Sequence, residues 1–222
     1  MSVWLTRIVP DPRCTETRRD LAGTTAGNLH RRLMSLFPDQ AGPDPRARFG
    51  VLFRLEDTPA GPHLLLQSTH QPDLARLPAD YGSSLSRPLD DLLDALKPGL
   101  TIRYRCAASP VRKPGATTRA LYNLPAVVPL TGAHADEWWT RQADGAGLRP
   151  LTLHSLPLDA ARSTRPNASG TTASIRHARV RFDGTATITD TDLLRRKITD
   201  GIGRGKAYGC GLLSIAPARS TT

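Results

Sequence analysis

The order in which strand-like and helical patterns follow one another is the feature that most constrains the fold of this chain. Four segments of the first half have the apolar, β-branched composition and the flanking turn residues of strands: 3–9, 49–55, 63–68 and 101–107. Apolar residues at helical spacing separate the first strand from the second, within 29–37, and the third from the fourth, within 88–96. Strand, helix, strand, strand, helix, strand is the order of a ferredoxin-like unit. The sequence therefore predicts an α+β fold whose first ferredoxin-like domain spans residues 1–110.

The second half of the chain carries a weaker version of the same order, after a link rich in proline, glycine and arginine at 109–118. The expected elements are a helix at 133–143, a strand at 151–156, a mobile loop or hairpin tip at 162–172, a strand at 175–182 that turns at Asp183-Gly184 and continues over 185–189, a helix at 192–199 and a strand at 212–216. We therefore expect a second, degraded ferredoxin-like domain at residues 119–222, although no internal repeat is visible in the sequence.

The charge of the chain indicates a polyanionic partner. Its formal net charge is +10, its isoelectric point is about 10.4, and 26 of its 30 basic residues are arginine. Nucleic acid is the commonest polyanion, and the planar guanidinium binds phosphate or a guanine edge through two hydrogen bonds. A GC-rich genome would explain the preference for arginine over lysine, but it does not explain the excess of bases over acids.

Composition also narrows the compartment and the cofactor classes. No apolar run is long enough to span a bilayer, and residues 1–10 lack the basic-then-apolar layout of a secretory signal, so we expect a soluble, cytoplasmic protein. The cysteines Cys14, Cys106 and Cys210 are far apart and form no CxxC pair, which predicts reduced thiols rather than a zinc site or disulfides. No motif indicates a cofactor.

The sharpest motif is the glycine-rich segment 201–211, between an expected helix and an expected strand. Glycine permits positive φ and close backbone approach, so successive N–H groups can form a nest that binds an anion. Arg204 and Lys206 add positive charge. The segment is neither a Rossmann fingerprint, which follows a strand and opens a helix, nor a P-loop, which needs GK[ST]. A helix cap with a flexible turn is the alternative, and the basic residues favour phosphate binding over it.

His30 is the candidate for proton transfer. It lies about 100° around the expected helix from Leu29, at the edge of the apolar face, and Arg31 and Arg32 follow it. Imidazole titrates near neutral pH and can accept or donate a proton beside a phosphate that the two arginines would attract. On these residues alone, a role in packing or at the surface is the simpler interpretation.

Other chemistries have little support. No spaced acidic cluster suggests a two-metal nuclease, and neither GxSxG nor HExxH occurs. Asp90, Asp91 and Asp94 are typical of a solvated helix face, and core packing is the simpler role for Trp138 and Trp139.

Several short stretches of the chain together form a recognisable series: VWLTRIV at 3–9, RRDL at 18–21, LHR at 29–31, FRLE at 53–56, LLLQS at 64–68, PGL and RYR between 98 and 105, and the glycine-rich run between 201 and 217. In these stretches the chain resembles the CasE family, the repeat-cleaving endoribonucleases of type I-E CRISPR systems. The stretches cover nearly the whole chain in the family's order, and the last of them is the most specific.

The resemblance implies two tandem ferredoxin-like domains and a metal-independent cut, in which the substrate's 2′-hydroxyl attacks the phosphate and leaves a 2′,3′-cyclic phosphate. It implies that His30 is the catalytic histidine and makes Arg31 a candidate to hold the phosphate or its developing charge. The family has a tyrosine three residues before that histidine, where this chain has Gly27. The implied partners are the CRISPR repeat RNA hairpin, the crRNA and the other Cascade subunits, with no metal or membrane required.

The resemblance also maps RNA contacts to a basic β-hairpin at 162–181 and to the glycine-rich segment. The expected RNA-binding residues are Arg32, Arg162, Arg165, Arg176, Arg179, Gly201, Gly203, Arg204, Gly205 and Lys206. A-form RNA closes its major groove to side chains, so the hairpin should contact the end of a stem and its phosphates.

Two other functions stand beside the endoribonuclease. A catalytically weak or inactive repeat-RNA-binding subunit of Cascade is the main alternative, which Gly27 keeps open. A splicing factor of the RRM type would need aromatic residues on its central strands, and only Tyr104 is evident there.

Overall fold

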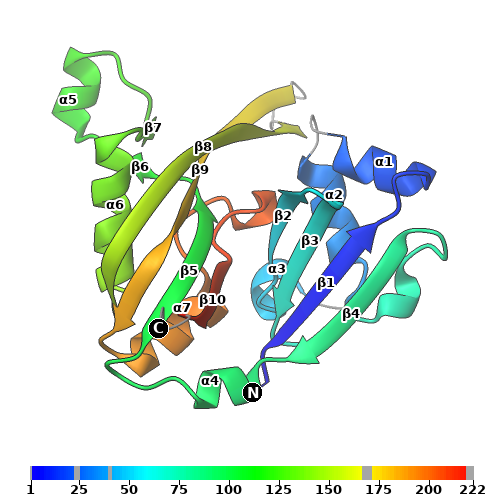
Figure 1. Cartoon of the computed structure of the whole chain (residues 1–222). Helices are drawn as coiled ribbons and strands as arrows, with labels where there is room; N and C mark the ends of the chain where they lie inside the picture. The colour runs from blue at the N-terminus through cyan, green and yellow to red at the C-terminus, as the bar shows by residue number, and fades with distance from the viewer. Residues whose placement is uncertain (1, 23–25, 40–41, 167–171, 219–222) are drawn as a thin grey trace.

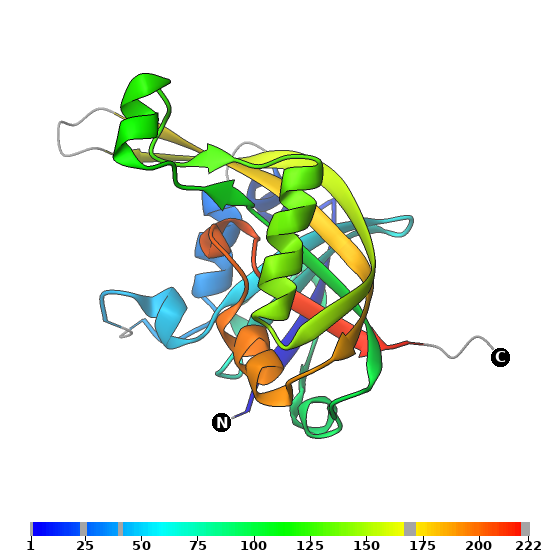
Figure 2. The same ribbon diagram turned by 90° about the vertical axis from the view of Figure 1, so that its left-hand side faces the viewer.

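Two antiparallel four-stranded sheets lie side by side in this protein (Figure 1). The structure is a computed structural model that describes residues 2–22, 26–39, 42–166 and 172–218. Helices α6 and α7 cover one face of the second sheet, and the glycine-rich segment runs between the two sheets (Figures 1 and 2). Among the described residues, no helix is long and apolar enough to cross a membrane.

The first sheet has the strand order β2-β3-β1-β4. Its strands are β1 (Trp4–Pro10), β2 (Leu52–Thr58), β3 (Gly61–Ser68) and β4 (Gly82–Pro88), and the accompanying helices are α1 (Thr15–Leu21), α2 (Ala26–Met34), α3 (Pro45–Arg48) and the 3₁₀ turn η1 (Leu74–Arg76). Leu29 and Leu33 of α2 are buried in one apolar core with Ile8 of β1 and Leu64 of β3. The apolar side of α2 that the sequence predicted therefore packs on the sheet.

Two elements of the first unit differ from the sequence prediction. The strand expected to close it at 101–107 is β5 (Thr101–Ala108), which pairs with β9 and β10 of the second sheet, so that expectation is wrong. The helix expected at 88–96 is the shorter α4 (Asp90–Asp94), which connects the sheets. The fourth strand is instead β4, which is exposed along most of its length. An exposed edge strand buries no apolar face, so it leaves no alternating pattern to detect.

The second sheet has the equivalent order β10-β5-β9-β8, so the prediction of an α+β fold with two ferredoxin-like units is confirmed. Besides β5 this unit contains α6 (Ala133–Asp144), β8 (Leu148–Pro166), β9 (Thr172–Ile188), α7 (Thr191–Asp200), the 3₁₀ turn η2 (Lys206–Tyr208) and β10 (Leu213–Pro217). Trp138 and Trp139 are buried, and Trp139 stacks on Phe182 with 4.9 Å between ring centroids. The predicted core role of the two tryptophans is confirmed.

Strands β8 and β9 form one long hairpin that the sequence predicted only in pieces. Asp183-Gly184 is not a turn, because β9 continues through both residues. A Cβ on Gly184 would lie 2.1 Å from the carbonyl oxygen of Thr152, so glycine is needed for the close approach of β8 rather than for a reversal of the chain. Part of the segment 162–172, expected as a loop or hairpin tip, is strand, and residues 167–171 lie outside the described residues.

Between β5 and α6 the chain leaves the body of the second domain (Figure 2). This excursion contains β6 (Val111–Arg112), α5 (Ala116–Leu121) and β7 (Val128–Pro129), where the sequence predicted a link. Leu121 and Tyr122 at the end of α5 are exposed.

A buried arginine fastens the first sheet to the second. Arg54 of β2 has 3% of its surface exposed, and its guanidinium donates to the carbonyl oxygens of Leu212 at 3.0 Å and Arg105 at 3.2 Å. It also donates to the Ser214 hydroxyl and to the Glu56 carboxylate, both at 2.8 Å. These bonds link β2 to β5 and β10, so they determine how the two domains face each other.

Removing this guanidinium should destabilise the whole protein. Arg54→Met keeps much of the apolar stem but removes the guanidinium that donates to two carbonyl oxygens and the Ser214 hydroxyl at the interface, and leaves the Glu56 carboxylate with Arg105 alone. Breaking a buried charged network by removing one partner typically costs about 3–5 kcal/mol, and chemical denaturation should show a loss of that order in the free energy of unfolding. Arg87→Met, at an exposed position of β4, is the matched control and should change this free energy by less than ~0.5 kcal/mol. Equal stability of the two variants would contradict the role of Arg54.

Candidate functional site

His30 lies on α2 at the edge of the helix face that packs on the first sheet. Its half-buried ring stacks on Phe53, with 6.3 Å between ring centroids and 25° between ring planes. The Nδ1 atom is buried and has no hydrogen-bond partner among the described residues, so a proton exchanged with a substrate would use Nε2. Burial first, and the charge of Arg46 second, lower the pKa of His30, so its surroundings favour the neutral imidazole.

Arg46 acts on the charge of His30, and Lys206 lies on an element that packs against α2. Arg46 comes from α3, whose N-terminus is capped by the carboxylate of Asp44. Lys206 comes from η2, which lies against both α2 and β2. Burial is the larger cause that lowers the pKa of Lys206, and Arg46 adds to it, as it does for His30. Arg46 therefore lies within electrostatic reach of both His30 and Lys206, and an anion bound near it would relieve this repulsion.

Arg46 is a residue of this site that the sequence analysis missed. The residues before it, 39–45, read as a loop rich in proline, glycine and aspartate, which gave no reason to place the next residue beside His30. The signal that could have found it was local. Asp44 followed by Pro45 matches the N-cap and the first position of a helix, and α3 begins there.

The glycine-rich segment holds η2 and Lys206 in place. Gly205 and Gly209 flank η2 with φ of 76° and 75°, a left-handed conformation that costs little only for glycine. The Lys206 ammonium donates to the carbonyl oxygen of Asp200 at the end of α7. Arg204 is exposed on the same segment. Phosphate binding by the glycine-rich segment stays a prediction. Although this segment lies near the end of the sequence, its turn η2 packs against α2, the helix that carries His30.

The same segment is packed against the first domain, so it is more than a helix cap. Gly201 ends α7 with φ of 76°, and a Cβ there would come within 2.7 Å of the Leu52 side chain of β2. The segment also closes on itself, because the N–H of Ile202 donates to the carbonyl oxygen of Gly211 at 2.9 Å. Gly203 lies against Trp138, where a Cβ would come within 3.1 Å of the ring.

The whole chain is similar to CRISPR-associated proteins. The profile of the family described as CRISPR associated protein matches residues 3–217. The CRISPR-associated endoribonuclease Cse3 of Thermus thermophilus is 30% identical over 226 residues, which cover 97% of this chain and 100% of that protein. The chain belongs to the Cse3/CasE family. The Cascade subunit CasE of Escherichia coli K12 is 31% identical over 196 residues, covering 85% of this chain and 90% of CasE.

The fold places the chain in the same family. A solved structure of Cse3 bound to a 19-nucleotide RNA has a TM-score of 0.79 to this chain at 28% identity, covering 98% of this chain and 100% of that one. The resemblance to CasE that the sequence motifs indicated is confirmed, and so are the two ferredoxin-like units that it implied.

Arg31, the predicted phosphate-holding residue of this Cse3/CasE chain, is exposed on α2. Its guanidinium donates to the side-chain oxygen of Asn28 at 2.5 Å and to the carbonyl oxygen of Gly27 at 3.3 Å. It lines a basic hollow of about 360 Å³ between α1 and α2, together with Arg19 and Arg32. A phosphate contact by Arg31 stays a prediction, and the backbone at Gly27 serves to orient it.

Arg32 has a structural partner. Its Nε donates to the carboxylate of Asp20 at 2.7 Å, and its guanidinium lies over the ring of Tyr81 at 5.5 Å from the centroid. The hydroxyl of Tyr81 donates to the same carboxylate at 3.4 Å, and burial, more than this carboxylate, raises the pKa of Tyr81. The ion pair ties α2 to α1, and an RNA contact by Arg32 remains a prediction beside that role.

The arginines expected to bind RNA on the hairpin lie along β8 and β9. Arg162 and Arg176 are paired across the two strands and are exposed. Arg179, nearer the body of the sheet, is half-buried and donates to the carbonyl oxygen of Asp159 at 2.7 Å. The side chain of Arg165 lies outside the described residues. RNA binding by these arginines stays a prediction.

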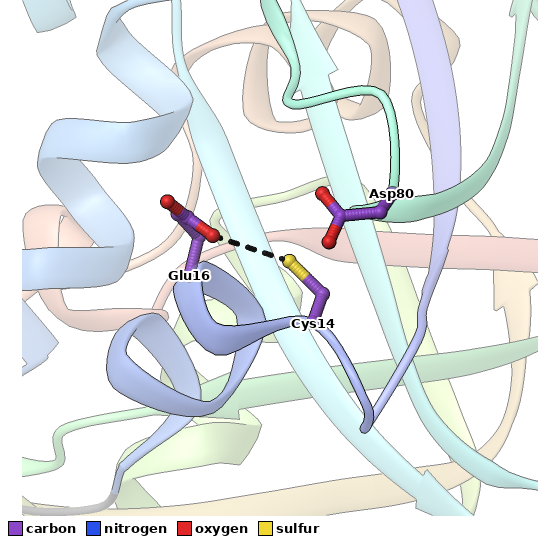
Figure 3. A group of neighbouring side chains, drawn as sticks. All are labelled: Cys14, Glu16 and Asp80. Atoms are coloured by element: carbon purple, nitrogen blue, oxygen red, sulfur yellow. Dashed lines mark hydrogen bonds between the residues drawn. The ribbon is translucent and has the colours of Figure 1, made fainter.

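One group of possible metal ligands occurs among the described residues, and it belongs to other elements (Figure 3). Cys14, Glu16 and Asp80 bring ligand atoms within 4.8 Å of one another, and the Cys14 thiol donates to the Glu16 carboxylate at 3.5 Å. The three residues come from the start of α1 and the turn before β4, and none belongs to α2, α3 or η2. Three donors fall short of a closed four-ligand zinc site. We therefore assign the group no part in the chemistry of His30.

The charge of Arg46 should be measurable in the titration of His30. Arg46→Gln removes a positive charge that disfavours the imidazolium, so the pKa of His30 should rise toward its usual value, while the depression caused by burial remains. NMR titration of the imidazole resonances, with His30 assigned by its loss in His30→Gln, measures this directly. Arg48→Gln, at an exposed position of the same helix, is the control and should leave the titration unchanged. An unaltered pKa of His30 in Arg46→Gln would show that the two groups are not neighbours in solution.

Proposed function

We propose that this protein binds the hairpin of CRISPR repeat RNA and cleaves the precursor transcript as an endoribonuclease. The observation that carries the proposal is the half-buried His30, whose pKa is lowered by burial and by Arg46, on the helix that the glycine-rich segment with Lys206 meets. The names of its relatives support it, since Cse3 is called an endoribonuclease and is solved with RNA in a pre-cleavage complex. The net charge of +10 suits an RNA substrate.

The reaction we propose is attack by the 2′-hydroxyl of one nucleotide on its own 3′-phosphate. A bond forms between O2′ and phosphorus, the bond from phosphorus to the 5′-oxygen of the next nucleotide breaks, and the products are a 2′,3′-cyclic phosphate and a 5′-hydroxyl. His30 moves the proton. In its neutral form it can take the proton of the 2′-hydroxyl, and as imidazolium it can give one to the departing 5′-oxygen.

Positively charged side chains can stabilise the negative charge that develops on the phosphate during the reaction. Arg46 and Lys206 would stabilise the non-bridging oxygens, because fixed positive charges in a half-buried place act without solvent reorganisation. Arg31 is the further candidate for this role, from the exposed side of α2. The same cations would repel a divalent metal ion from His30, so we infer that the cleavage needs no metal.

The hairpin of β8 and β9 and the relatives of this chain indicate further RNA contacts and protein partners. Exposed Arg162 and Arg176 on β8 and β9 suit the phosphates at the end of an RNA stem. Because the relative CasE is a Cascade subunit, we infer that this protein also binds the crRNA and other Cascade subunits. Its substrate is a transcript, and we therefore place its activity in the cytoplasm.

A repeat-RNA-binding subunit with weak or no turnover is the second candidate. Gly27 favours it, because the family tyrosine that the resemblance implies at this position is absent. The two functions differ in one measurement, which is whether repeat RNA is cut by the purified protein.

Replacing His30 should separate cleavage from binding. General acid–base catalysis is typically worth ~10²–10⁴-fold in rate, so His30→Ala should lose roughly that factor in single-turnover cleavage of the cognate repeat RNA while its dissociation constant changes little. His134→Ala, at an exposed position of α6, is the control, and a melting curve of each variant comes first. Undiminished cleavage would assign the proton transfer elsewhere. A parallel collapse of binding would make His30 a positioning residue for RNA.

Cleavage should persist when divalent metal is removed. The purified protein incubated with repeat RNA in excess EDTA is expected to cut at the rate seen with magnesium, because the charge on the phosphate is met by side chains. A gel that resolves the two products measures the rate. Complete loss of cutting in EDTA, restored by magnesium, would contradict the metal-independent mechanism.

A further inference from the structure

A hollow of about 310 Å³ lies between the two domains, next to the place of His30. Leu29, which precedes His30 on α2, forms part of its wall, and so does Phe53, on whose ring His30 stacks. Ala161 of β8 and Tyr208 of η2 close it from the second domain. Its size is at the lower end of the range for small-molecule sites, which is ~300–1,000 Å³.

The floor of the hollow is apolar. Phe53, Leu29 and Ala161 are buried, and the half-buried Leu55 adds to the same surface. A floor of this kind excludes a phosphate group, which would lose its hydration without gaining hydrogen bonds. It accepts a flat apolar face.

Tyr208 supplies an aromatic ring that is held in one position. It belongs to η2, which the left-handed Gly205 and Gly209 fix at both ends. His177 of β9 supports the ring, with 4.5 Å between ring centroids and 32° between ring planes. Tyr208 is half-buried and lines the hollow, so a flat group in the hollow can stack beside a ring that needs no ordering on binding.

The rim of the hollow carries carboxylates that a phosphate site would not contain. Asp57 and Asp159 are exposed at its edge, and neither forms an ion pair with any residue in the described part of the chain. Arg179 is the cation of the rim, and its Nε is bound to the carbonyl oxygen of Asp159. Carboxylates accept hydrogen bonds from amino groups, which cytosine, adenine and guanine have and uracil lacks.

We propose that this hollow binds an unpaired nucleobase with an exocyclic amino group, from a nucleotide next to the cleaved phosphate. The base lies on the apolar floor beside Tyr208, and its amino group donates to Asp57 or Asp159. Its backbone stays outside, near Arg46, Lys206 and the glycine-rich segment. This inference rests on the proposed function, since it takes RNA to be the ligand.

The test is a double-mutant cycle between Tyr208 and the RNA. The cut is first mapped from the products, and binding is then measured with repeat RNA that carries a 2′-deoxy sugar at the cut, either intact or with one unpaired nucleotide near the cut made abasic. Stacking of one base on an aromatic side chain corresponds to roughly 5- to 140-fold in affinity. We expect one abasic position to weaken binding by this factor, Tyr208→Leu to weaken binding of intact RNA similarly, and the two changes together to cost no more than either alone.

Controls and base replacements complete the design. Tyr122→Leu, at an exposed position after α5, should leave binding unchanged, and Tyr208→Phe should retain most of the affinity because it keeps the ring. Uracil at the sensitive position should also weaken binding, and Asp57→Asn together with Asp159→Asn should reduce that discrimination. Melting curves of all variants establish that they are folded.

The outcomes separate this inference from the function on which it rests. If the unaltered protein binds and cuts repeat RNA but no abasic position couples to Tyr208, the hollow is not a base site and the proposed function stands. The inference is also overturned if, at every abasic position, the loss of affinity from Tyr208→Leu and the loss from the missing base multiply, because the two changes are then independent. If the unaltered protein does not bind repeat RNA, both fail.

Discussion

The guanidinium of Arg54 is the interaction on which the rest of the structure depends. It is almost fully buried, and it donates to backbone and side-chain oxygens of the second domain while staying paired with Glu56 of its own strand. A buried charge of this kind is costly unless every donor is used, so it permits one arrangement of the domains and penalises others. The side-chain amide of Gln67 adds a second tie, donating to the carbonyl oxygen of Ile198 at 2.6 Å.

This arrangement of the domains creates the site. His30 belongs to the first domain and Lys206 to the second, and neither domain alone contains both. Gln67 of β3 is bonded to Ile198 near the end of α7, and Gly201 packs on Leu52 of β2. The glycine-rich segment that follows places η2 against α2. Burial is the larger cause that lowers the pKa of His30 and that of Lys206, and Arg46 adds repulsion to both. The chemistry proposed for His30 is therefore a property of the domain interface.

Elements with one buried face could be predicted from the period of their apolar residues. An exposed edge strand and a close approach between two strands could not, because neither produces such a period. Leu29, Leu33 and Trp139 indicated their helices in the sequence, because these buried residues belong to one apolar face of each helix. Strand β4 buries little, and Gly184 looked like a turn residue although it serves to let β8 approach. His30 was a candidate from its position and from the family resemblance. Arg46 was not, because its proximity to His30 is a tertiary fact that no spacing along the chain expresses.

The distribution of charge around this interface gives the bound RNA a direction. Positive charge from Arg46 and Lys206 gathers near α2, whereas Asp57 and Asp159, which form no ion pair within the described part of the chain, edge the apolar hollow that Phe53 lines. Phosphates are attracted to the first region and repelled by the second, while a base is accepted by the second. A strand that satisfies both must place its backbone along the cations and turn a base inward. That pose separates the two nucleotides at the cut, which frees the 2′-hydroxyl to move toward the line of attack. In a chain with Gly27 before His30, such positioning of the RNA would have to supply more of the rate, because reacting groups held in line gain as much as a further catalytic group contributes.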